Sequence, residues 1–290
     1  MRPLFRGLAE GFESMEALDP IAAPVRDLVQ RVVPNEGQAK DLLSGTWLGH
    51  PLHPLLTDVT IGAWLSASML DVLGGRGGEG AARRLTGLGI LSALPTAAAG
   101  LSDWVDGGPK IRRVGIVHAV ANVTGLLLQI LSWRSRRKGH RARGRAWGML
   151  GMGVTTGSAY LGGHLSFGRG MGVNQTAFEV APKSWKKVMD AEALPEGKLV
   201  RGSVAGPGGA IGLVMYRQDE QVRVLSDRCS HMGCSLSDGE VRGGDAVTCP
   251  CHGSTFSLED GSILKGPATA PQPAFEARIA GGKVEVRPRP

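Results

Sequence analysis

Residues 229–234 of the chain read Cys-Ser-His-Met-Gly-Cys, and residues 249–254 read Cys-Pro-Cys-His-Gly-Ser. These two stretches hold all 4 cysteines of the 290-residue sequence and 2 of its 7 histidines. Each stretch offers one thiolate and one imidazole on a short loop, Cys229-x-His231 in the first and Cys249-x2-His252 in the second. The 17 residues between His231 and Cys249 are enough for a hairpin that brings the loops together. The pattern therefore predicts a metal centre.

Two kinds of metal centre use this donor set. A Rieske [2Fe–2S] cluster has two cysteines on one iron and two histidines on the other. A structural zinc site of the Cys2His2 type binds the same four side chains around one ion. The spacing alone leaves both alternatives open.

The residues around these loops predict a small all-β domain over residues 178–290. Short β-like runs at 211–216, 221–225, 246–248 and 283–286 are separated by Gly, Asp-Gly and Pro turn signals. A glycine-rich connector, residues 167–177, precedes this domain.

Both cysteine–histidine stretches resemble the cluster-binding boxes of Rieske proteins, most closely those of quinol–cytochrome c reductases. Asp260-Gly261 and Gly266-Pro267-Ala268 resemble the proline loop that shields the cluster in that family. The resemblance covers residues 178–290 and favours the [2Fe–2S] cluster over zinc. It implies that Cys229 and Cys249 bind one iron, and that His231 and His252 bind the other.

The resemblance also implies roles for four neighbouring residues. Cys234 and Cys251 match the cysteines that form a disulfide between the two loops in quinol–cytochrome c reductases. Ser254 matches the serine whose hydroxyl group bonds a bridging sulfide. Phe256 stands where high-potential members carry a tyrosine that bonds a cluster cysteine, so we expect a lower reduction potential here.

The N-terminal part of the chain is expected to be helical and to span a membrane. Apolar stretches at 55–73, 85–101, 114–133 and 147–163 are each close to the ~20 residues needed to cross a bilayer. They predict an all-α four-helix transmembrane bundle. The expected domains are a polar or amphipathic segment at 1–48, the membrane domain at 49–166, the connector at 167–177 and the Rieske domain at 178–290.

Charge is unevenly distributed and predicts the topology. Residues 178–290 hold 14 Lys/Arg and 14 Asp/Glu, so the net charge of +7 comes from residues 1–177. Seven Lys/Arg lie in 134–145, between apolar stretches, which is a membrane-loop pattern and not the basic folded face of a nucleic-acid-binding protein. With four spans, the basic loops 74–84 and 134–146 share the cytoplasmic side. We therefore expect a multi-pass bacterial membrane protein with its Rieske domain outside the cytoplasm, where a disulfide also persists best.

Three histidines, His53, His118 and His164, lie near span ends on the side expected for the Rieske domain. Near-membrane ionisable residues are functional candidates. Two of the three could bind haem b between helices, or they could form a quinone pocket with Asp58 or Asp103, or they could bond interfacial backbone and lipid headgroups. Residues 49–54 and 162–165 resemble an uncharacterised family of four-helix bacterial membrane domains.

The expected function is one-electron transfer through the cluster, with a quinol, a haem or a redox partner protein, at a lipid membrane surface. Such a chain would be an oxidoreductase component of a larger redox system. The alternative is a membrane-anchored redox-sensing or interaction module. A Rieske oxygenase is disfavoured because it needs a mononuclear iron site with two further histidines, and no histidine follows His252.

Overall fold

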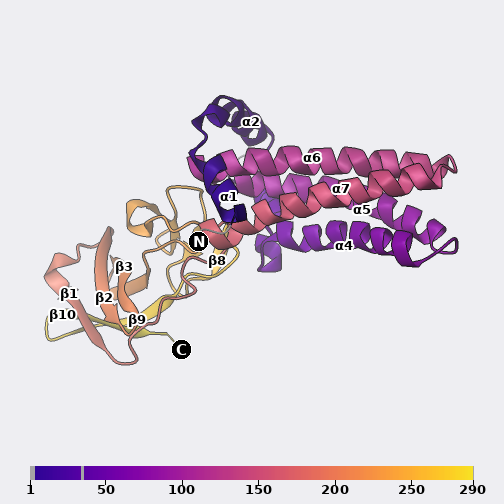
Figure 1. Cartoon of the computed structure of the whole chain (residues 1–290). Coiled ribbons are helices and arrows are strands. Elements are labelled where there is room, and N and C mark those ends of the chain that lie inside the picture. The colour runs from indigo at the N-terminus through magenta and orange to yellow at the C-terminus, as the bar shows by residue number, and fades with distance from the viewer. Residues whose placement is uncertain (1–3, 34–35, 290) are drawn as a thin grey trace. The chain divides into compact units, whose positions relative to one another are not determined.

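A computed structural model of the chain describes residues 4–33 and 36–289 (Figure 1). The chain divides into two compact units. One comprises Met1–Val33 and Leu52–Met171, and the other comprises Pro34–Pro51 and Gly172–Pro290. The first unit is helical, and the second contains all the strands.

Four long helices form the body of the helical unit. They are α4 (Leu52–Leu73), α5 (Glu79–Trp104), α6 (Pro109–Arg137) and α7 (Arg141–Gly163). Helix α4 packs along α5, α6 packs along α7, and contacts of α5 with α6 and of α4 with α7 close the bundle. Helices α1 (Leu4–Ser14) and α2 (Asp19–Val32) pack against α6, and a π-helical turn, His164–Gly168, follows α7. The four predicted helices are therefore confirmed, each extending beyond its apolar stretch at one end or at both.

Three of these helices, α4, α5 and α6, are long and apolar enough to cross a membrane. Helix α7 is not in this group, because it begins with three arginines within five residues and is rich in glycine, serine and threonine. Length and composition thus support three spans, and the fourth span stays a prediction.

Polar and small residues fill the helical interior. The Trp64 indole donates to the Thr86 carbonyl at 3.3 Å, and Gly89 leaves the space that the ring occupies. Nearer the C-terminal end of α4, Arg136 binds the Asp71 carboxylate with both terminal nitrogens, one of them at 2.8 Å. Both side chains are almost fully buried, at 1% and 5% exposure. Arg136, read from the sequence as part of a basic loop, is therefore an internal partner of α4.

Two antiparallel sheets build the second unit. The larger has the strand order β1-β10-β9-β4-β3-β2, and the smaller has the order β5-β6-β7-β8. Their bounds are β1 Lys186–Asp190, β2 Leu199–Gly206, β3 Gly209–Gln218, β4 Gln221–Ser226, β5 Glu240–Arg242, β6 Ala246–Thr248, β7 Thr255–Ser257, β8 Ile263–Lys265, β9 Ala274–Ala280 and β10 Lys283–Pro288. The predicted all-β domain is confirmed.

The cysteine–histidine loops extend from an apolar core. Alternating buried residues of β3 and β4 face two apolar clusters, one on each side of the large sheet. The second cluster contains Cys229, Cys249 and Phe256 together with Leu225 and Val247. A short helix from the N-terminal part of the chain, α3 (Gln38–Ser44), also belongs to this unit.

Candidate metal centre

The two cysteine–histidine loops have the same backbone closure. In the first, which follows β4, the Cys229 N–H donates to the Cys234 carbonyl at 2.8 Å, and the Gly233 N–H donates to the Cys229 carbonyl at 2.9 Å. In the second, between β6 and β7, the Cys249 N–H donates to the Ser254 carbonyl at 2.8 Å, and the Gly253 N–H donates to the Cys249 carbonyl at 3.1 Å. Both glycines have a positive φ, 79° and 78°, which favours glycine at these positions.

This closure brings the two free thiols together in the core. Cys229 and Cys249 are 1% and 2% exposed. The hydrogen bond between them lowers the pKa of Cys249 to about 7, and the same hydrogen bond and burial raise the pKa of Cys229. Backbone N–H groups also point at each sulfur, from His231 and Met232 to Cys229 and from Cys251 and His252 to Cys249. Such donors stabilise a thiolate, free or bound to iron.

Two imidazoles lie side by side on the same loops. The ring centroids of His231 and His252 are 5.0 Å apart and the rings are nearly perpendicular, at 87°. Burial, followed by the nearby His252 and Lys40, lowers the pKa of His231 to about 3. The His231 ring is therefore neutral at physiological pH, which is the form that binds metal ions. Two paired thiols and two adjacent imidazoles fit the donor set of a Rieske cluster.

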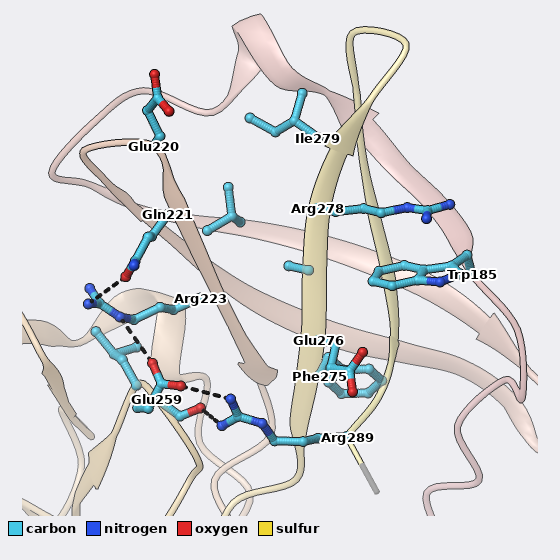
Figure 2. A pocket seen from close by; sticks show the side chains of 13 residues that line it. Trp185, Glu220, Gln221, Arg223, Glu259, Phe275, Glu276, Arg278, Ile279 and Arg289 are labelled. Atoms are coloured by element: carbon cyan, nitrogen blue, oxygen red, sulfur yellow. Dashed lines mark hydrogen bonds and ion pairs between the residues drawn. The ribbon is translucent and has the colours of Figure 1, made fainter.

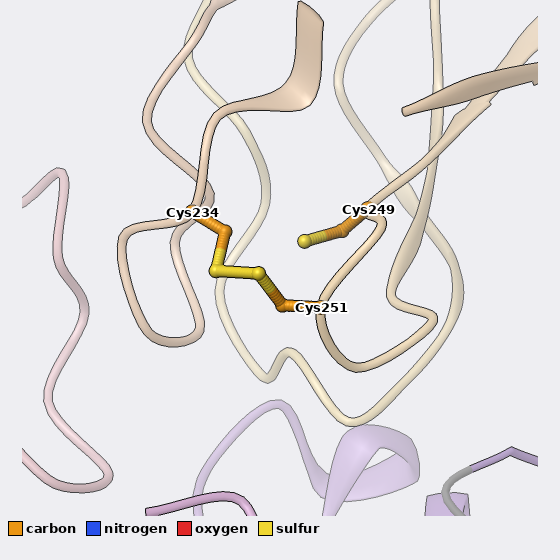
Figure 3. Close-up of side chains that lie close together, drawn as sticks. All are labelled: Cys234, Cys249 and Cys251. Carbon is orange, nitrogen blue, oxygen red and sulfur yellow. A yellow bond between two sulfur atoms is a disulfide. The ribbon is translucent and has the colours of Figure 1, made fainter. Parts of the chain in front are cut away.

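The other two cysteines form a disulfide between the loops, as predicted. The Cys234 and Cys251 sulfurs are 2.03 Å apart, and Figure 3 shows this bond beside the Cys249 sulfur. The sulfur atoms of Cys234, Cys249 and Cys251 all lie within 4.8 Å of one another. They are not a three-cysteine metal site, because a disulfide has no thiolates to offer.

A third loop, which follows β8, closes over the second. The Ala268 N–H donates to the Ser254 hydroxyl oxygen at 3.0 Å, and both residues are fully buried. Further along, the buried Gln272 side chain accepts from the Ser230 N–H at 3.0 Å and donates to the Ser226 carbonyl at 2.8 Å. Gln272 thus fixes the first loop, a role for which the sequence carries no motif.

These loops and sheets define a protein of the Rieske type, and comparisons with known families agree. Residues 184–276 match the family described as Rieske [2Fe-2S] domain, and residues 49–175 match the family described as Predicted membrane protein (DUF2231). "Ferredoxin CarAc" from Metapseudomonas resinovorans is 34% identical over 102 residues, which are 35% of this chain and 92% of that protein. The chain belongs to the Rieske [2Fe–2S] family, and it joins that domain to a DUF2231 membrane domain.

Other relatives are also ferredoxins. The 3-phenylpropionate/cinnamic acid dioxygenase ferredoxin subunit of Escherichia coli (strain K12) is 29% identical over 91 residues, covering 31% of this chain and 81% of that one. A chain in the solved structure "Complex of reduced oxygenase and oxidized ferredoxin in carbazole 1,9a-dioxygenase" is 33% identical, with a TM-score of 0.32, and 37% of this chain matches 94% of it. The resemblance of the cluster boxes to quinol–cytochrome c reductases stays a prediction.

The predicted haem b is not supported. His53 donates from Nδ1 to the Thr96 carbonyl at 2.9 Å, and so links α4 to α5. His118 donates from Nδ1 to the Ser158 carbonyl at 2.8 Å and accepts at Nε2 from the Asn122 amide at 3.0 Å, so both of its ring nitrogens have protein partners.

His164 is bound at the end of α7. Its Nε2 lies 2.6 Å from a carboxylate oxygen of Glu13, which also accepts from Arg169. Burial opposes ionisation of Glu13, but the hydrogen bonds from Arg169 and His164 hold its pKa below its usual value. The three histidines thus have structural partners within the helical unit.

A polar groove of about 410 Å³ lies beside β4 and β9 (Figure 2). Its charged side chains pair with one another, for example Arg289 with Glu259 at 2.7 Å. Arg278 stacks over the Trp185 ring at 4.2 Å. The lining of the groove contains neither cysteine nor histidine, so the groove is not part of the metal centre.

Proposed function

We propose that this chain is a membrane-anchored one-electron carrier. Cys229 and Cys249 hold one iron of a [2Fe–2S] cluster, and His231 and His252 hold the other. The observation that carries the proposal is the matched closure of the two loops, which places two buried thiols in contact and two imidazole rings 5.0 Å apart. The bound cluster supplies reversible one-electron chemistry. The chain's own residues bind it, exclude water from its sulfur side and donate N–H groups to the ligand sulfurs.

The exchange partner we propose is a redox protein. The relatives named ferredoxins support this choice, and the name of one of them places it with a dioxygenase. A cluster held by Cys229, Cys249, His231 and His252 would supply one-electron exchange between two proteins, and that exchange would require no net proton transfer. A quinol, which releases two electrons, would need a second acceptor, and we treat it as the competing outcome.

We also propose that the helical unit anchors the Rieske unit on the extracytoplasmic side. The Cys234–Cys251 disulfide supports this orientation, because disulfides persist outside the reducing cytosol. The basic residues at the end of α6 and the start of α7 support it as well. An alkaline phosphatase fusion after residue 289 should be active in cells, and an inactive but expressed fusion would reverse the orientation.

Electron paramagnetic resonance (EPR) spectroscopy with iron and zinc analysis tests the ligand assignment. The dithionite-reduced, detergent-purified protein should give a Rieske signal. His231→Ala and His252→Ala should each abolish this signal. The matched control is His50→Ala, an exposed histidine outside the loops. Retention of the signal in either ligand variant, or zinc in place of iron in the wild-type protein, would contradict the assignment.

Partner choice is then tested by stopped-flow mixing. Reduction of the cluster by a reduced ferredoxin reductase, but not by a soluble quinol, would support a protein partner. Fast reduction by the quinol alone would replace that part of the proposal. If neither reduces the cluster on the timescale of turnover, the sensing alternative gains support.

A further inference from the structure

A segment from the N-terminal part of the chain is bound to the third loop of the metal centre. Residues 36–48 belong to the Rieske unit, although helices α4 to α7 lie between them and the first strand of that unit in the sequence. The Asp41 carboxylate accepts from the Gly266 N–H at 2.9 Å. The Thr46 hydroxyl donates to the Ala268 carbonyl at 3.2 Å. We call residues 36–48 the clamp.

The clamp contacts the second loop as well as the third. A Cβ atom on Gly253 would lie 2.6 Å from Glu36 Cγ, so the Glu36 side chain packs directly on that glycine. Glu36 also accepts from the Lys265 ammonium at 2.6 Å, at the start of the third loop. A Cβ atom on Gly266 would lie 2.1 Å from Thr46 Oγ1. The clamp therefore extends from the second loop to the third and lies close to both.

The third loop is itself bound to both cysteine–histidine loops. The Ala268 N–H donates to the Ser254 hydroxyl oxygen at 3.0 Å in the second loop. The Ser230 hydroxyl of the first loop donates to the Ala270 carbonyl at 2.8 Å. Ala268 has no exposed surface and packs in the apolar cluster that contains Cys229. The third loop is thus part of the wall around the two free thiols.

Ala268 links the clamp to the centre through its two backbone groups. Its carbonyl accepts from the clamp, and its N–H donates to the second loop. The clamp is attached to both loops, so each of its bonds adds to the free energy needed to separate them locally. A hydrogen bond to a carboxylate contributes more than one between neutral groups, so we expect Asp41 to contribute more than Thr46.

We propose that Asp41 and Thr46 are positioning residues that hold the third loop closed and thereby retain the cluster. The clamp lies outside residues 184–276, the stretch that matches the Rieske family, so it is an addition from the N-terminal part of the chain. The position of the third loop is a property of the folded chain alone. The retention of the cluster rests on the proposed function.

Hydrogen–deuterium exchange of the detergent-purified full chain tests the position of the third loop. The probe is the Ala268 N–H, whose partner Ser254 is present in every variant. Thr46→Val should raise the exchange rate of this N–H about two- to tenfold, and Asp41→Ala should raise it about tenfold or more. Thr46→Ser and Asp41→Asn keep the hydroxyl group or the oxygen acceptor, so they should restore most of the protection.

Three features separate this local effect from general destabilisation. Thr176→Val removes a buried threonine hydroxyl group of the same unit, bound to Asn174 at 2.8 Å, and should leave Ala268 exchange unchanged. The N–H groups that pair β1 with β10, at one edge of the large sheet, open without breaking a clamp bond and should keep their wild-type exchange rates in the clamp variants. Alanine is a good helix former, so Asp41→Ala should keep α3 intact.

Release of iron to the chelator ferrozine, added to the dithionite-reduced protein, tests the retention of the cluster. Cluster absorbance should be lost faster in Thr46→Val and Asp41→Ala, by the same factors as the Ala268 exchange, because both processes use the same opening. The starting EPR signal should equal that of the wild-type protein, because no ligand is changed.

The outcomes separate the two proposals. A wild-type protein without a Rieske signal would overturn the proposed function, and the exchange rates would still test the clamp. Wild-type Ala268 exchange in both Thr46→Val and Asp41→Ala would overturn the clamp. Equally raised exchange in Thr46→Val and Thr46→Ser would also overturn it, because that result assigns the effect to packing. Faster exchange with an unchanged rate of iron release would overturn the role in cluster retention.

Discussion

The hydroxyl group of Ser254 has two predicted effects that can be measured separately. Ser254 is fully buried, and its oxygen accepts from the Ala268 N–H at 3.0 Å. Because that bond uses a lone pair, the hydroxyl hydrogen remains available to donate to a bridging sulfide, as the family resemblance implies. Ser254→Ala removes both interactions and adds no bulk.

The first effect is on the reduction potential. A hydrogen bond to a negatively charged acceptor contributes about 1.5–3 kcal/mol, and a bond to a neutral one about 0.5–1.5 kcal/mol. The bond to sulfide is stronger in the reduced cluster, so its loss should cost the reduced state about 1–2 kcal/mol more than the oxidised state. At ~59 mV for each 1.4 kcal/mol, the midpoint potential should fall by about 40–90 mV.

The second effect is on stability. Without the Ser254 oxygen, the Ala268 N–H is left buried with its partner removed, which costs about 1–3 kcal/mol. The variant should therefore lose its cluster at a lower urea concentration, while its EPR signal at low urea remains. Redox titration and cluster absorbance in urea measure the two effects on one preparation.

The matched control is Ser226→Ala. Ser226 is also fully buried in the Rieske unit, but its hydroxyl group donates to Glu179 at 2.7 Å. This control should lose stability and keep its potential. If Ser254→Ala keeps the wild-type potential to within about 10 mV, or raises it, then Ser254 does not donate to the cluster and the reasoning is refuted.

Three other predictions concern burial and covalent closure. Phe256 is fully buried in the same apolar cluster as Cys229 and Cys249. Phe256→Tyr should therefore add a hydrogen-bond donor and raise the midpoint potential by about 40–90 mV in the same titration. An unchanged or lower potential would contradict the hydrogen-bond argument. The double variant Cys234→Ser/Cys251→Ser should keep its cluster but lose about 3 kcal/mol of free energy of unfolding, because the disulfide links residues 17 apart. A cluster lifetime in urea equal to that of the wild-type protein would argue against a structural disulfide. Arg136→Met should cost about 3–5 kcal/mol in thermal unfolding in detergent, because it removes the two-pronged partner of the buried Asp71 carboxylate and leaves only Arg145, at 3.6 Å. Arg134→Met, at an exposed position, should cost little; equal losses would show that the ion pair is unimportant.

The metal centre could be predicted from the sequence because its donors are close together along the chain. Each loop closes on itself within six residues through its own backbone, so the motif carries most of its geometry. The disulfide was predicted from the resemblance of the same two motifs to a known family. Gln272 could not be found in this way, because its role depends on loops more than 40 residues away, and an isolated glutamine resembles any polar surface residue.

The helices were predicted from apolar length, and their polar interior was not. Arg136 lies in a run of basic residues that reads as a solvated loop. The structure extends α6 through that run and pairs Arg136 with Asp71, 65 residues away. Helical phase alone could place Arg136 on the same face as Ser132, but nothing in the sequence selects Asp71 as its partner. Similarly, His118 and His164 were recognised as candidates, but their actual partners, Ser158 and Glu13, come from other helices.

The groups around the metal centre oppose one another in their expected effect on the potential. Phe256 has no hydroxyl group to donate to the cluster ligands, which favours the oxidised cluster. The backbone N–H donors to Cys229 and Cys249 favour the reduced one. These donors belong to the two loops themselves, so they are retained when the side chain at position 256 is changed. Phe256→Tyr should therefore raise the potential without altering the backbone donors.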